Sequence, residues 1–458
     1  MAFDTAFCSH QAWSVSISSI FCSTILTHLG SVGSFNPNII CIFNKTKVQI
    51  QLNKVAVIGG GAAGFFAAIN IKMFNPNCEV VLFEKTNKLL TKVLVSGGGR
   101  CNVTNACYEN AVLVKNYPRG EKELRSVFSR FSTEDIVSWF RNYDIELKTE
   151  PDGRMFPVSN NSATIANCFL KEAQQLGIKI NLGSELISIT KTDSAAYVLE
   201  FKNGTIFNAD KLLITTGGSA KEESYSFIKK LGHSIVSPIP SLFTFNVPNN
   251  PILKLLGISV PQAIVSIRNT KLQLQGPLLI THWGLSGPVI LKLSAFGATE
   301  LHKVNYNFSV EVNWVGEQNK AYFMEQLIQH KKKNHVKNVL NSSIGNLPSR
   351  LWEFFVAKSG IPENAKWADL SNEKLNRLFV CLVADVYEAK GKTTFKEEFV
   401  TCGGVSLNEV DLKRMESKIN QNVFFAGEVL NIDGITGGFN FQNAWSTAWI
   451  AAKSITEK

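Results

Sequence analysis

Lys54–Phe74 reads KVAVIGGGAAGFFAAINIKMF, and this stretch decides the fold. A short apolar run from Val55 to Ile58 leads into Gly59-x-Gly61-x-x-Gly64 and then into an alanine-rich segment. The pattern predicts a strand, a tight turn and a helix. Gly59 permits the turn, Gly61 lets backbone amides approach a pyrophosphate, and Gly64 lets the helix lie close to the strand. The stretch therefore predicts the first unit of a dinucleotide-binding fold.

A second strand is expected at Glu79–Phe83, and an acidic residue follows it directly. Glu84 stands at the distance from Gly64, about 20 residues, at which such folds place an acid. A carboxylate at this point accepts hydrogen bonds from an adenosine ribose and repels the 2′-phosphate of NADP. The alternative interpretation of Glu84 is an ordinary charge at the end of a strand.

Residues 88–105 read KLLTKVLVSGGGRCNVTN, in which three glycines precede an arginine. Gly97, Gly98 and Gly99 free the backbone to wrap an anion, and Arg100 offers a planar guanidinium fork. The stretch predicts a loop beside a ligand, with a plain surface loop as the alternative. Small polar side chains nearby can hydrogen-bond a flavin or its ribityl chain: Ser96, Asn102 and Thr104.

With these motifs the chain resembles the BaiN-like (HI0933/YhiN) family of bacterial flavoproteins, whose hallmark is the SGGGRCNxTN stretch after a dinucleotide fold. The resemblance runs from about Gln51 to the C-terminus. Two more hallmark segments follow in order, TCGGV at 401–405 and FAGEVLNIDGITGGFNFQ at 425–442. The resemblance implies bound FAD and a discontinuous FAD domain with another domain inserted between its parts. It leaves the substrate open.

The C-terminal segment predicts that the chain returns to the cofactor. Residues 423–428 are expected to form a strand, and Gly437 and Gly438 to open a helix over 441–455. The resemblance implies that the N-terminus of this helix faces the flavin, where its partial positive charge would stabilise the anionic reduced form. Asp433 has the alternative interpretation of a helix cap. Residues expected to contact the ligand, its ribityl chain or the flavin here are Gly427, Glu428, Asp433 and Asn440.

The chain between the SGGGR segment and the C-terminal segment is expected to continue the FAD-binding domain first and then to form the inserted domain. A helix is expected over 163–176 and strands near Ile178, Leu186 and Val198, and the resemblance implies that Leu186 contacts the adenine through its backbone. Residues 210–218 (DKLLITTGG) predict a buried strand whose end, with Thr216 and Gly217, returns toward the cofactor or is merely a strand end. From 238 to 397 short strands (243–247, 263–267, 272–274 and 308–312) and then helices over 319–387 are expected.

One stretch of the insertion, 276–288 (GPLLITHWGLSGP), resembles a further family segment. His282 and Ser286 would face the flavin or pin a turn, and a lone histidine is more often structural. Four side chains stay open as proton donors or catalytic groups: Cys101, His282, Cys402 and Glu428.

Composition and cysteine usage restrict the class of protein. The 458 residues are 45% hydrophobic and 18% charged, which is typical of globular proteins with two or three domains. The nine cysteines are irregularly spaced without a CxxC pair, which argues against a zinc site and against a secreted disulfide framework. We therefore expect no metal and a reducing, cytoplasmic location.

The net charge of +10 leaves the partner open. Its longest basic run, Lys331 to Lys333 followed by Lys337, falls on an expected amphipathic helix, so a solvated helix face is favoured over an RNA patch. The first fifty residues lack the basic region of a signal peptide, the continuous apolar run of a membrane span and the arginines of a transit peptide. They are expected to form a poorly ordered extension.

The sequence thus predicts an α/β protein: a three-layer, Rossmann-like FAD-binding domain at 51–237 and 398–458, interrupted by a β-barrel-like plus helical domain at 238–397. The expected function is an FAD-dependent oxidoreductase acting on a small unsaturated carbonyl or amine, with NAD(P)H as a transient reductant or O2 as partner. An FAD-dependent RNA modifier or flavin-bound RNA-binding factor is the weaker alternative, and the oligomeric state is open. Cofactor-binding residues expected besides those already named are Ala62, Ala63, Lys85 and Lys92.

Overall fold

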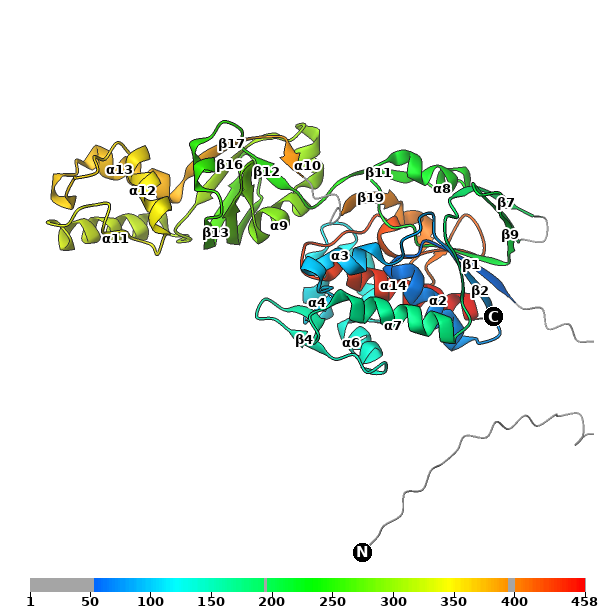
Figure 1. Cartoon of the computed structure of the whole chain (residues 1–458). Helices are drawn as coiled ribbons and strands as arrows, with labels where there is room; N and C mark the ends of the chain where they lie inside the picture. Colours follow the sequence, from blue (N-terminus) through cyan, green and yellow to red (C-terminus); the bar gives the residue numbers. More distant parts are fainter. Residues whose placement is uncertain (1–52, 193–195, 394–399, 458) are drawn as a thin grey trace, which may run out of the picture. The chain divides into compact units, whose positions relative to one another are not determined.

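The computed structural model describes residues 53–192, 196–393 and 400–457 (Figure 1). Its first elements are β1 (Lys54–Ile58), α2 (Ala62–Phe74) and β2 (Glu79–Phe83), so the predicted strand, turn, helix and second strand are confirmed. The four apolar residues of β1 are buried. The strand lies between two parallel neighbours, and such sheets are covered on both faces, so the side chains on either side of the strand lie inside the protein. The predicted extension over residues 1–50 lies outside the described residues.

The central sheet has seven strands, in the order β20 (Val410–Asp411), β21 (Glu416–Ser417), β22 (Val423–Phe425), β10 (Lys211–Ile214), β1, β2 and β6 (Lys179–Asn181). Ile58, the last residue of β1, pairs with Ile214 of β10 (Lys211–Ile214) on one side and with Phe83 of β2 on the other, both in parallel. The chain leaves β1 toward β2 and returns later on the opposite side to form β10. In such sheets ligands bind in the crevice at the carboxyl ends of the strands where the order reverses. Here that point is the end of β1 and β10.

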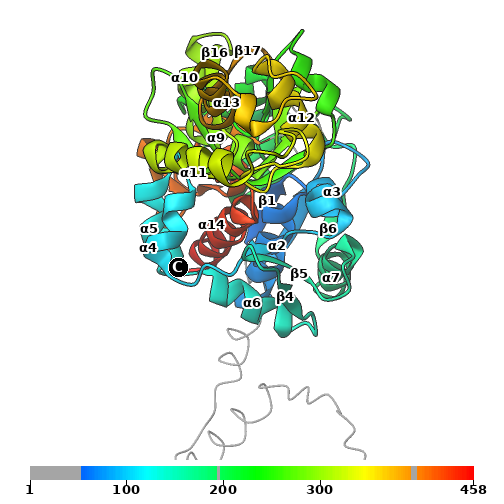
Figure 2. The ribbon, with the colours of Figure 1, turned by 90° about the vertical axis from the view of Figure 1, so that its left-hand side faces the viewer.

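Two helices and a small antiparallel sheet complete the three layers of the predicted fold. The helices α2 and α14 (Phe439–Thr456) lie side by side (Figure 2), and the Phe66 and Trp445 ring centroids are 5.4 Å apart. The small sheet consists of β7 (Leu186–Lys191), β8 (Tyr197–Phe201) and β9 (Ile206–Ala209). Phe83 of β2 stacks on Phe201 of β8 at 4.3 Å. The Rossmann-like architecture is therefore confirmed.

The chain between the two parts of this fold forms a second, antiparallel sheet. Its order is β17-β16-β13-β14-β15-β12-β18. The two strands at the ends of this order are separated in sequence by Gly391 alone, so the sheet curls until its edges meet, as the barrel-like prediction requires. The strands are β12 (Thr244–Asn246), β13 (Ser259–Ile267), β14 (Gln273–Ile280), β15 (Gly284–Ser286), β16 (Asn307–Asn313), β17 (Asp385–Lys390) and β18 (Lys392–Thr393).

The helices of this region differ in part from the prediction. Three lie in the expected stretch: α11 (Lys320–Lys333), α12 (Ser349–Lys358) and α13 (Asn372–Val383). The prediction of helix as far as Tyr387 was wrong, because 385–390 alternates buried and exposed residues with the period of a strand and pairs with β16. Two further helices, α9 (Pro288–Phe296) and α10 (Ala298–Lys303), were not predicted.

Buried apolar residues form two large clusters. One draws on residues between 55 and 228 and between 405 and 455, together with Ala295, and the other on residues between 243 and 389. The strands β11 (Ile235–Pro240) and β19 (Thr401–Val405), which pair in antiparallel fashion, stand where the chain passes between these segments. The boundaries at 237/238 and 397/398 stay a prediction, and the second falls in a stretch outside the described residues.

The remaining helices and strands are mostly short. Predicted helices over 163–176 and 441–455 correspond to α7 and α14. The bounds are α3 (Thr91–Gly99), β3 (Thr104–Asn105), α4 (Asn110–Leu113), α5 (Glu121–Phe128), α6 (Thr133–Arg141), β4 (Leu147–Thr149), β5 (Arg154–Pro157), α7 (Ser162–Gln175), β6 (Lys179–Asn181), α8 (Ser226–Lys230), β20 (Val410–Asp411), β21 (Glu416–Ser417) and β22 (Val423–Phe425).

Candidate functional site

The three glycines after β1 differ in what surrounds them. A Cβ on Gly59, where φ is +118°, would lie 2.4 Å from the Thr215 carbonyl oxygen, and one on Gly64 would lie 1.9 Å from the Gly59 carbonyl oxygen. Apart from Gly61 itself and its two neighbours in the chain, no described residue has an atom within 4 Å of a Cβ on Gly61. The first and third glycines are therefore required by packing inside the protein, and the second borders open space.

The N-terminus of α2 begins beside that space. Gly61 is its N-cap, with Ala62 and Ala63 as its first residues, and among the described residues no side chain caps it and no acid stands in its first turn. The first backbone N–H groups of a helix have no partner within the helix and carry partial positive charge. An anion such as a pyrophosphate fits this position.

Glu84 lies directly beside the glycine turn. Its Oε2 accepts a hydrogen bond from the Gly60 N–H at 2.9 Å, and its Oε1 accepts from the backbone and hydroxyl of Thr86, both at 2.9 Å. The Glu84 carbonyl accepts from the Ser184 N–H at 2.8 Å, two residues before Leu186 at the start of β7. The structure thus brings the predicted ribose and adenine residues to the same end of β2, with Lys85 exposed next to them.

The end of β10 contributes a residue that the sequence reasoning missed. The Thr215 hydroxyl donates to the carbonyl oxygens of Ile58 at 2.9 Å and Gly59 at 3.1 Å and so joins β10 to the glycine turn. Predicted Thr216 is exposed, and predicted Gly217 has a φ of +72° with open space around its Cβ position. A hydroxyl at the end of a buried strand carries no sequence signal for such a contact.

Two charged residues 336 positions apart meet near the glycine turn that follows β1. The Lys92 ammonium of α3 lies 2.6 Å from Oε2 of Glu428, and Oε1 of Glu428 accepts from the Thr401 N–H at 3.0 Å. A Cβ on Gly218 would lie 2.8 Å from Oε1 of Glu428, and one on Gly427 would lie 3.0 Å from the Ala63 methyl. Four segments that are distant in the sequence, those of Ala63, Lys92, Gly218 and Glu428, are therefore neighbours here.

The SGGGR segment has the backbone expected of a loop. Ser96 leaves the helical conformation of α3, and the φ angles of Gly97, Gly98 and Gly99 are +59°, +68° and +80°. Arg100, predicted as a fork for a ligand, directs its guanidinium to Glu150 at 2.5 Å and stacks it on the Phe156 ring at 3.9 Å. This guanidinium therefore serves a contact inside the protein.

The end of this segment is fastened to the start of α14. The Asn102 side-chain amide, oriented so that both of its groups are satisfied, accepts from the Gly438 N–H at 2.9 Å and donates to the Thr104 carbonyl at 3.0 Å. The Asn105 side chain donates to the Gly437 carbonyl at 3.1 Å. The buried Thr104 hydroxyl donates to Oε1 of Gln442 at 2.6 Å. The second and third sequence motifs thus form one structure.

Asp433 and Asn440, both predicted to contact the ligand, are held by protein groups. Asp433 is fully buried, and its carboxylate forms a two-pronged ion pair with Arg119 and accepts from the Ser241 hydroxyl. Burial raises the pKa of this carboxyl, and the Arg119 guanidinium opposes the rise. Asn440 exchanges two hydrogen bonds with the Gly434 backbone, at 2.8 and 2.9 Å. The N-cap residue of α14 is Gly438, so Asp433 does not cap the helix.

The proton-donor candidates lie in different surroundings. Burial raises the pKa of the Cys101 thiol to about 12, and this effect outweighs the opposite effect of a hydrogen bond with the Ser96 side chain. Burial also raises the pKa of Cys402. His282 is exposed at the turn between β14 and β15, where its ring packs against Trp283 at 3.8 Å, and Ser286 is buried. Glu428 lies beside the glycines that follow β10, where a Cβ on Gly218 would lie 2.8 Å from its Oε1.

The residues at the carboxyl ends of β1 and β10 and in the glycine segments fit a dinucleotide cofactor. Open space borders Gly61, Gly98, Gly99 and Gly217, the α2 N-terminus offers backbone donors, and Glu84 offers acceptors. Within the described ranges no group of three or more His, Cys, Asp or Glu side chains has the arrangement of a metal site. None of the helices in those ranges is both long and apolar enough to cross a bilayer.

Comparisons with known proteins agree with this geometry. The model of the HI0933-like protein Rossmann domain matches residues 53–454. A ribosomal RNA dihydrouridine synthase of Haemophilus influenzae is 29% identical to this chain. The matched region spans 89% of this chain and 100% of that protein. A 3-dehydro-bile acid delta(4,6)-reductase of Clostridium scindens is 24% identical with the same coverage.

Solved structures show a more distant likeness. A 3-ketosteroid-delta4-(5alpha)-dehydrogenase of Rhodococcus jostii is 12% identical with a TM-score of 0.47, over 90% of this chain and 99% of that one. A flavocytochrome c3 fumarate reductase is 14% identical with a TM-score of 0.46, over 93% and 81% of the two chains.

Proposed function

The chain belongs to the HI0933-like family and is a flavin-dependent oxidoreductase, and we propose that it uses FAD to reduce a carbon–carbon double bond conjugated to a carbonyl group. The observation that carries the proposal is that the glycine turn after β1, the residues after β10 and the segment at Gly427 and Glu428 are neighbours at the carboxyl ends of β1 and β10. In folds with this strand order the crevice at that point holds a dinucleotide.

The names of two relatives support this substrate chemistry. Dihydrouridine differs from uridine by saturation of a ring double bond conjugated to a carbonyl, and a delta(4,6)-reductase of a 3-dehydro bile acid saturates double bonds conjugated to a ketone. An unsaturated carbonyl is therefore the chemistry common to both names. The sequence led us to expect an unsaturated carbonyl or an amine as the substrate, and we propose the unsaturated carbonyl.

The residues of the crevice would hold FAD in defined roles. The α2 N-terminus and the backbone at Gly61 would bind the pyrophosphate, and Glu84 would accept hydrogen bonds from the adenosine ribose. The first turn of α14, which contains no acid among the described residues, would place partial positive charge beside the flavin ring. When bound, FAD supplies hydride transfer by its own chemistry.

NAD(P)H is the reductant that we propose for this reaction. The balanced reaction takes one hydride and one proton into the double bond and releases oxidised NAD(P). An acid at Glu84 disfavours a 2′-phosphate only at the adenosine position of the resident dinucleotide, so NADH and NADPH remain equal candidates as transient reductants.

The proposal is tested by an anaerobic titration of the purified yellow protein. NADH or NADPH is expected to bleach the flavin bands, and 2-cyclohexenone or uridine to restore them, because each contains a double bond conjugated to a carbonyl. Benzylamine serves as the contrasting probe, since an amine oxidase would be reduced by it directly. Bleaching by benzylamine with no reoxidation by either unsaturated carbonyl contradicts the proposal, as does a protein that binds no FAD.

A further inference from the structure

The helices α11 and α13 lie side by side and run in opposite directions (Figure 1). The rings of Phe323 and Phe379 stack at 6.3 Å near one end of the pair, and the Lys331 ammonium donates to the Leu370 carbonyl at 2.5 Å near the other end. A groove of about 600 Å³ opens between the two helices. We call it the two-helix groove, and the residues that define it here are Met324, Ile328, Lys332, His335, Leu375 and Asn376.

The shape of the groove suits an elongated partner. Ile328, Lys332 and Asn376 are exposed, whereas Leu375 is buried. A small-molecule site encloses most of the surface of its ligand, which a groove with exposed walls does not do. From Met324 to Lys332 the α11 wall extends about 12 Å, which is roughly two turns of helix at a rise of about 1.5 Å per residue. A third helix of two or more turns therefore fits the length of the groove.

An apolar row lines the groove. Met324 and Ile328 are four residues apart on α11, so they lie on the same face of that helix, and Leu375 of α13 lines the groove with them. Such a row receives the apolar residues that a partner helix repeats every three or four positions. The flexible Met324 side chain adapts to different partners, and the exposed Asn376 amide offers both a donor and an acceptor at the rim.

The positive charge on the α11 side has no counter-charge within the described part of the chain. Lys332 and the nearby Lys337 form no ion pair with a described residue. On the α13 side the Glu373 carboxylate is already paired with Arg377 at 2.5 Å. Residues 320–383 contain ten Lys or Arg against five Asp or Glu. A partner that carries carboxylates therefore complements this surface.

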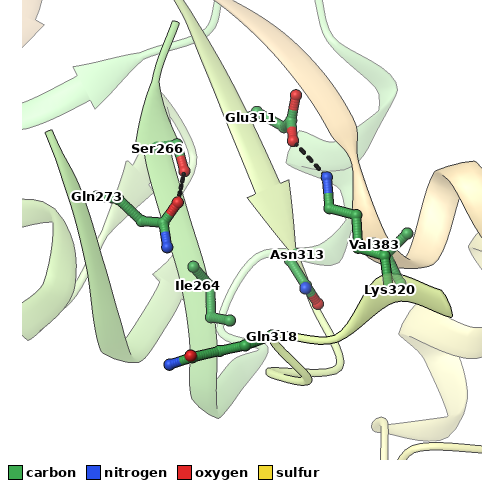
Figure 3. A pocket seen from close by; sticks show the side chains of 8 residues that line it. All are labelled: Ile264, Ser266, Gln273, Glu311, Asn313, Gln318, Lys320 and Val383. Atoms are coloured by element: carbon green, nitrogen blue, oxygen red, sulfur yellow. Dashed lines mark hydrogen bonds and ion pairs between the residues drawn. The ribbon is translucent and has the colours of Figure 1, made fainter. Parts of the chain in front are cut away.

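A second hollow of the inserted region gives a contrast (Figure 3). It is small, about 80 Å³, and the two charged side chains that line it pair with each other, with the Lys320 ammonium 2.9 Å from the Glu311 carboxylate. The Ser266 hydroxyl in the same hollow donates to Gln273 at 3.1 Å. These groups bind one another, so this hollow lacks the charge that the two-helix groove offers to a partner.

We propose that the two-helix groove binds an acidic amphipathic helix of another protein, with apolar residues on Met324, Ile328 and Leu375 and carboxylates at Lys332. The inference goes beyond the proposed function and does not depend on it. A single strand of nucleic acid would need aromatic rings for its bases, and no Phe, Tyr or Trp is among the described residues that line the groove. A lipid surface would need a convex apolar face in place of a groove.

The first test measures peptide binding to the purified full chain by fluorescence anisotropy. The probe is a labelled peptide of about 14 residues, with leucine repeated every three or four positions and glutamate on both flanks. One comparison peptide carries lysine in place of glutamate, and another has the same composition with its leucines scattered around the helix. The acidic amphipathic peptide is expected to bind at least about tenfold more tightly than either. It should also slow amide hydrogen exchange at 324–335 and 372–376 more than elsewhere.

A neutral substitution tests the apolar row. Ile328→Gln is expected to weaken binding of the acidic peptide about tenfold, because it removes an apolar contact from the middle of the groove. Val380→Gln is the matched control, since Val380 is an exposed apolar residue of α13 that does not line the groove. It should leave the affinity within about twofold.

A charge reversal tests the contact at Lys332. Lys332→Glu is expected to weaken the acidic peptide about three- to tenfold and to strengthen the lysine peptide by a similar factor. Lys271→Glu reverses the charge of an exposed lysine between β13 and β14 and serves as the control. A misfolded variant would lose both peptides, so the exchange of preference distinguishes a specific contact from damage to the fold.

The proposal fails if the acidic amphipathic peptide binds no more tightly than the scattered or the lysine peptide. Equal losses in Ile328→Gln and Val380→Gln, or a Lys332→Glu variant that keeps the wild-type preference, would also overturn it. Displacement of the peptide by phosphatidylserine vesicles or by polyuridylate, with no preference for the acidic peptide over the scattered one, would assign the surface to that ligand instead.

Discussion

Single atoms decide the roles of the glycines after β1. At Gly64 a methyl group would lie 1.9 Å from a carbonyl oxygen of the turn, whereas at Gly61 the same methyl would meet no described atom within 4 Å. The backbone of Gly61 has a φ of −94°, which any residue can adopt. Gly64 is therefore required by packing inside the protein, whereas Gly61 leaves room for a ligand in the adjoining space.

We predict that Gly61→Ala and Gly64→Ala fail in different ways. The Gly61→Ala apoprotein should unfold at nearly the wild-type urea concentration but bind FAD at least about tenfold more weakly, because the methyl occupies cofactor space. The Gly64→Ala apoprotein should itself lose stability, on the order of 1–3 kcal/mol, from overpacking. Urea unfolding and FAD titration measure the two effects. Unchanged FAD affinity in Gly61→Ala would show that the cofactor does not bind beside this turn.

His233 is a second place where one residue has a measurable consequence. Its ring is buried, with one nitrogen 3.2 Å from Glu409 and the other 2.8 Å from the Ser417 hydroxyl, and it packs on the edge of Phe425. Burial lowers the pKa of His233, and the nearby Glu409 carboxylate opposes this shift. The folded protein thus resists protonating a side chain that protonates freely in the unfolded chain.

The expected pH effect follows from this difference. Above the unfolded pKa of about 6.5 the contribution of His233 to stability is complete, and it is lost as the pH falls below that value toward the lowered folded pKa. The urea midpoint should therefore drop between about pH 6.5 and 5, and His233→Gln should flatten this part of the profile. An identical slope in the variant would assign the acid sensitivity to other groups.

At the scale of elements, the start of α14 is the piece that joins distant motifs. Gly438 approaches the Thr104 carbonyl so closely that a Cβ would lie 2.4 Å from it, and the Trp445 indole donates to the Val103 carbonyl at 2.9 Å. The Thr104 hydroxyl and the Gln442 amide, both fully buried, complete the contact. The position of the helix N-terminus is thereby set by the SGGGRCNVTN segment.

We predict that Thr104→Val destabilises the protein by about 1–3 kcal/mol, because it leaves the buried Gln442 oxygen without its donor. The same change at Thr205, a partly exposed hairpin residue, serves as the control and should be close to neutral. Chemical unfolding measures both variants. A neutral Thr104→Val would show that this hydrogen bond does not hold α14 to the segment.

At the scale of the whole described chain, Arg119 links the parts of the protein. Its guanidinium pairs with Asp433 near α14, donates to the Ser241 hydroxyl beyond β11, and donates to the Ala295 carbonyl of α9 at 2.5 Å. Ser241 and Ala295 belong to the stretch between the two segments of the FAD fold. One side chain therefore fastens three separate stretches of sequence.

We predict that Arg119→Met costs about 3–5 kcal/mol of stability, because it leaves the buried Asp433 carboxylate without a counter-charge. Arg125→Met removes a similar guanidinium from an exposed pair with Glu121 and should be nearly neutral. The double variant Arg119→Met/Asp433→Asn should recover part of the loss, since it removes the uncompensated charge. Equal midpoints for the two single variants would contradict this role of Arg119.

The sequence by itself determined the local units of this protein. The strand, glycine turn and helix at 54–74 follow from a short apolar run and three spaced glycines, and the strand at Glu79–Phe83 follows from its own pattern. Such elements are specified by neighbours along the chain, where side-chain period and backbone freedom act directly. The family resemblance extended this to the discontinuous fold.

Only the tertiary structure decided which distant residues meet. Arg119 with Asp433, Thr215 with the glycine turn, and Arg100 with Glu150 are contacts between residues that carry no mutual signal in one sequence. The strand that replaces the predicted end of the helical region depends on pairing with β16. Burial and pairing partners set these features, because a side chain's surroundings are fixed by the folded chain as a whole.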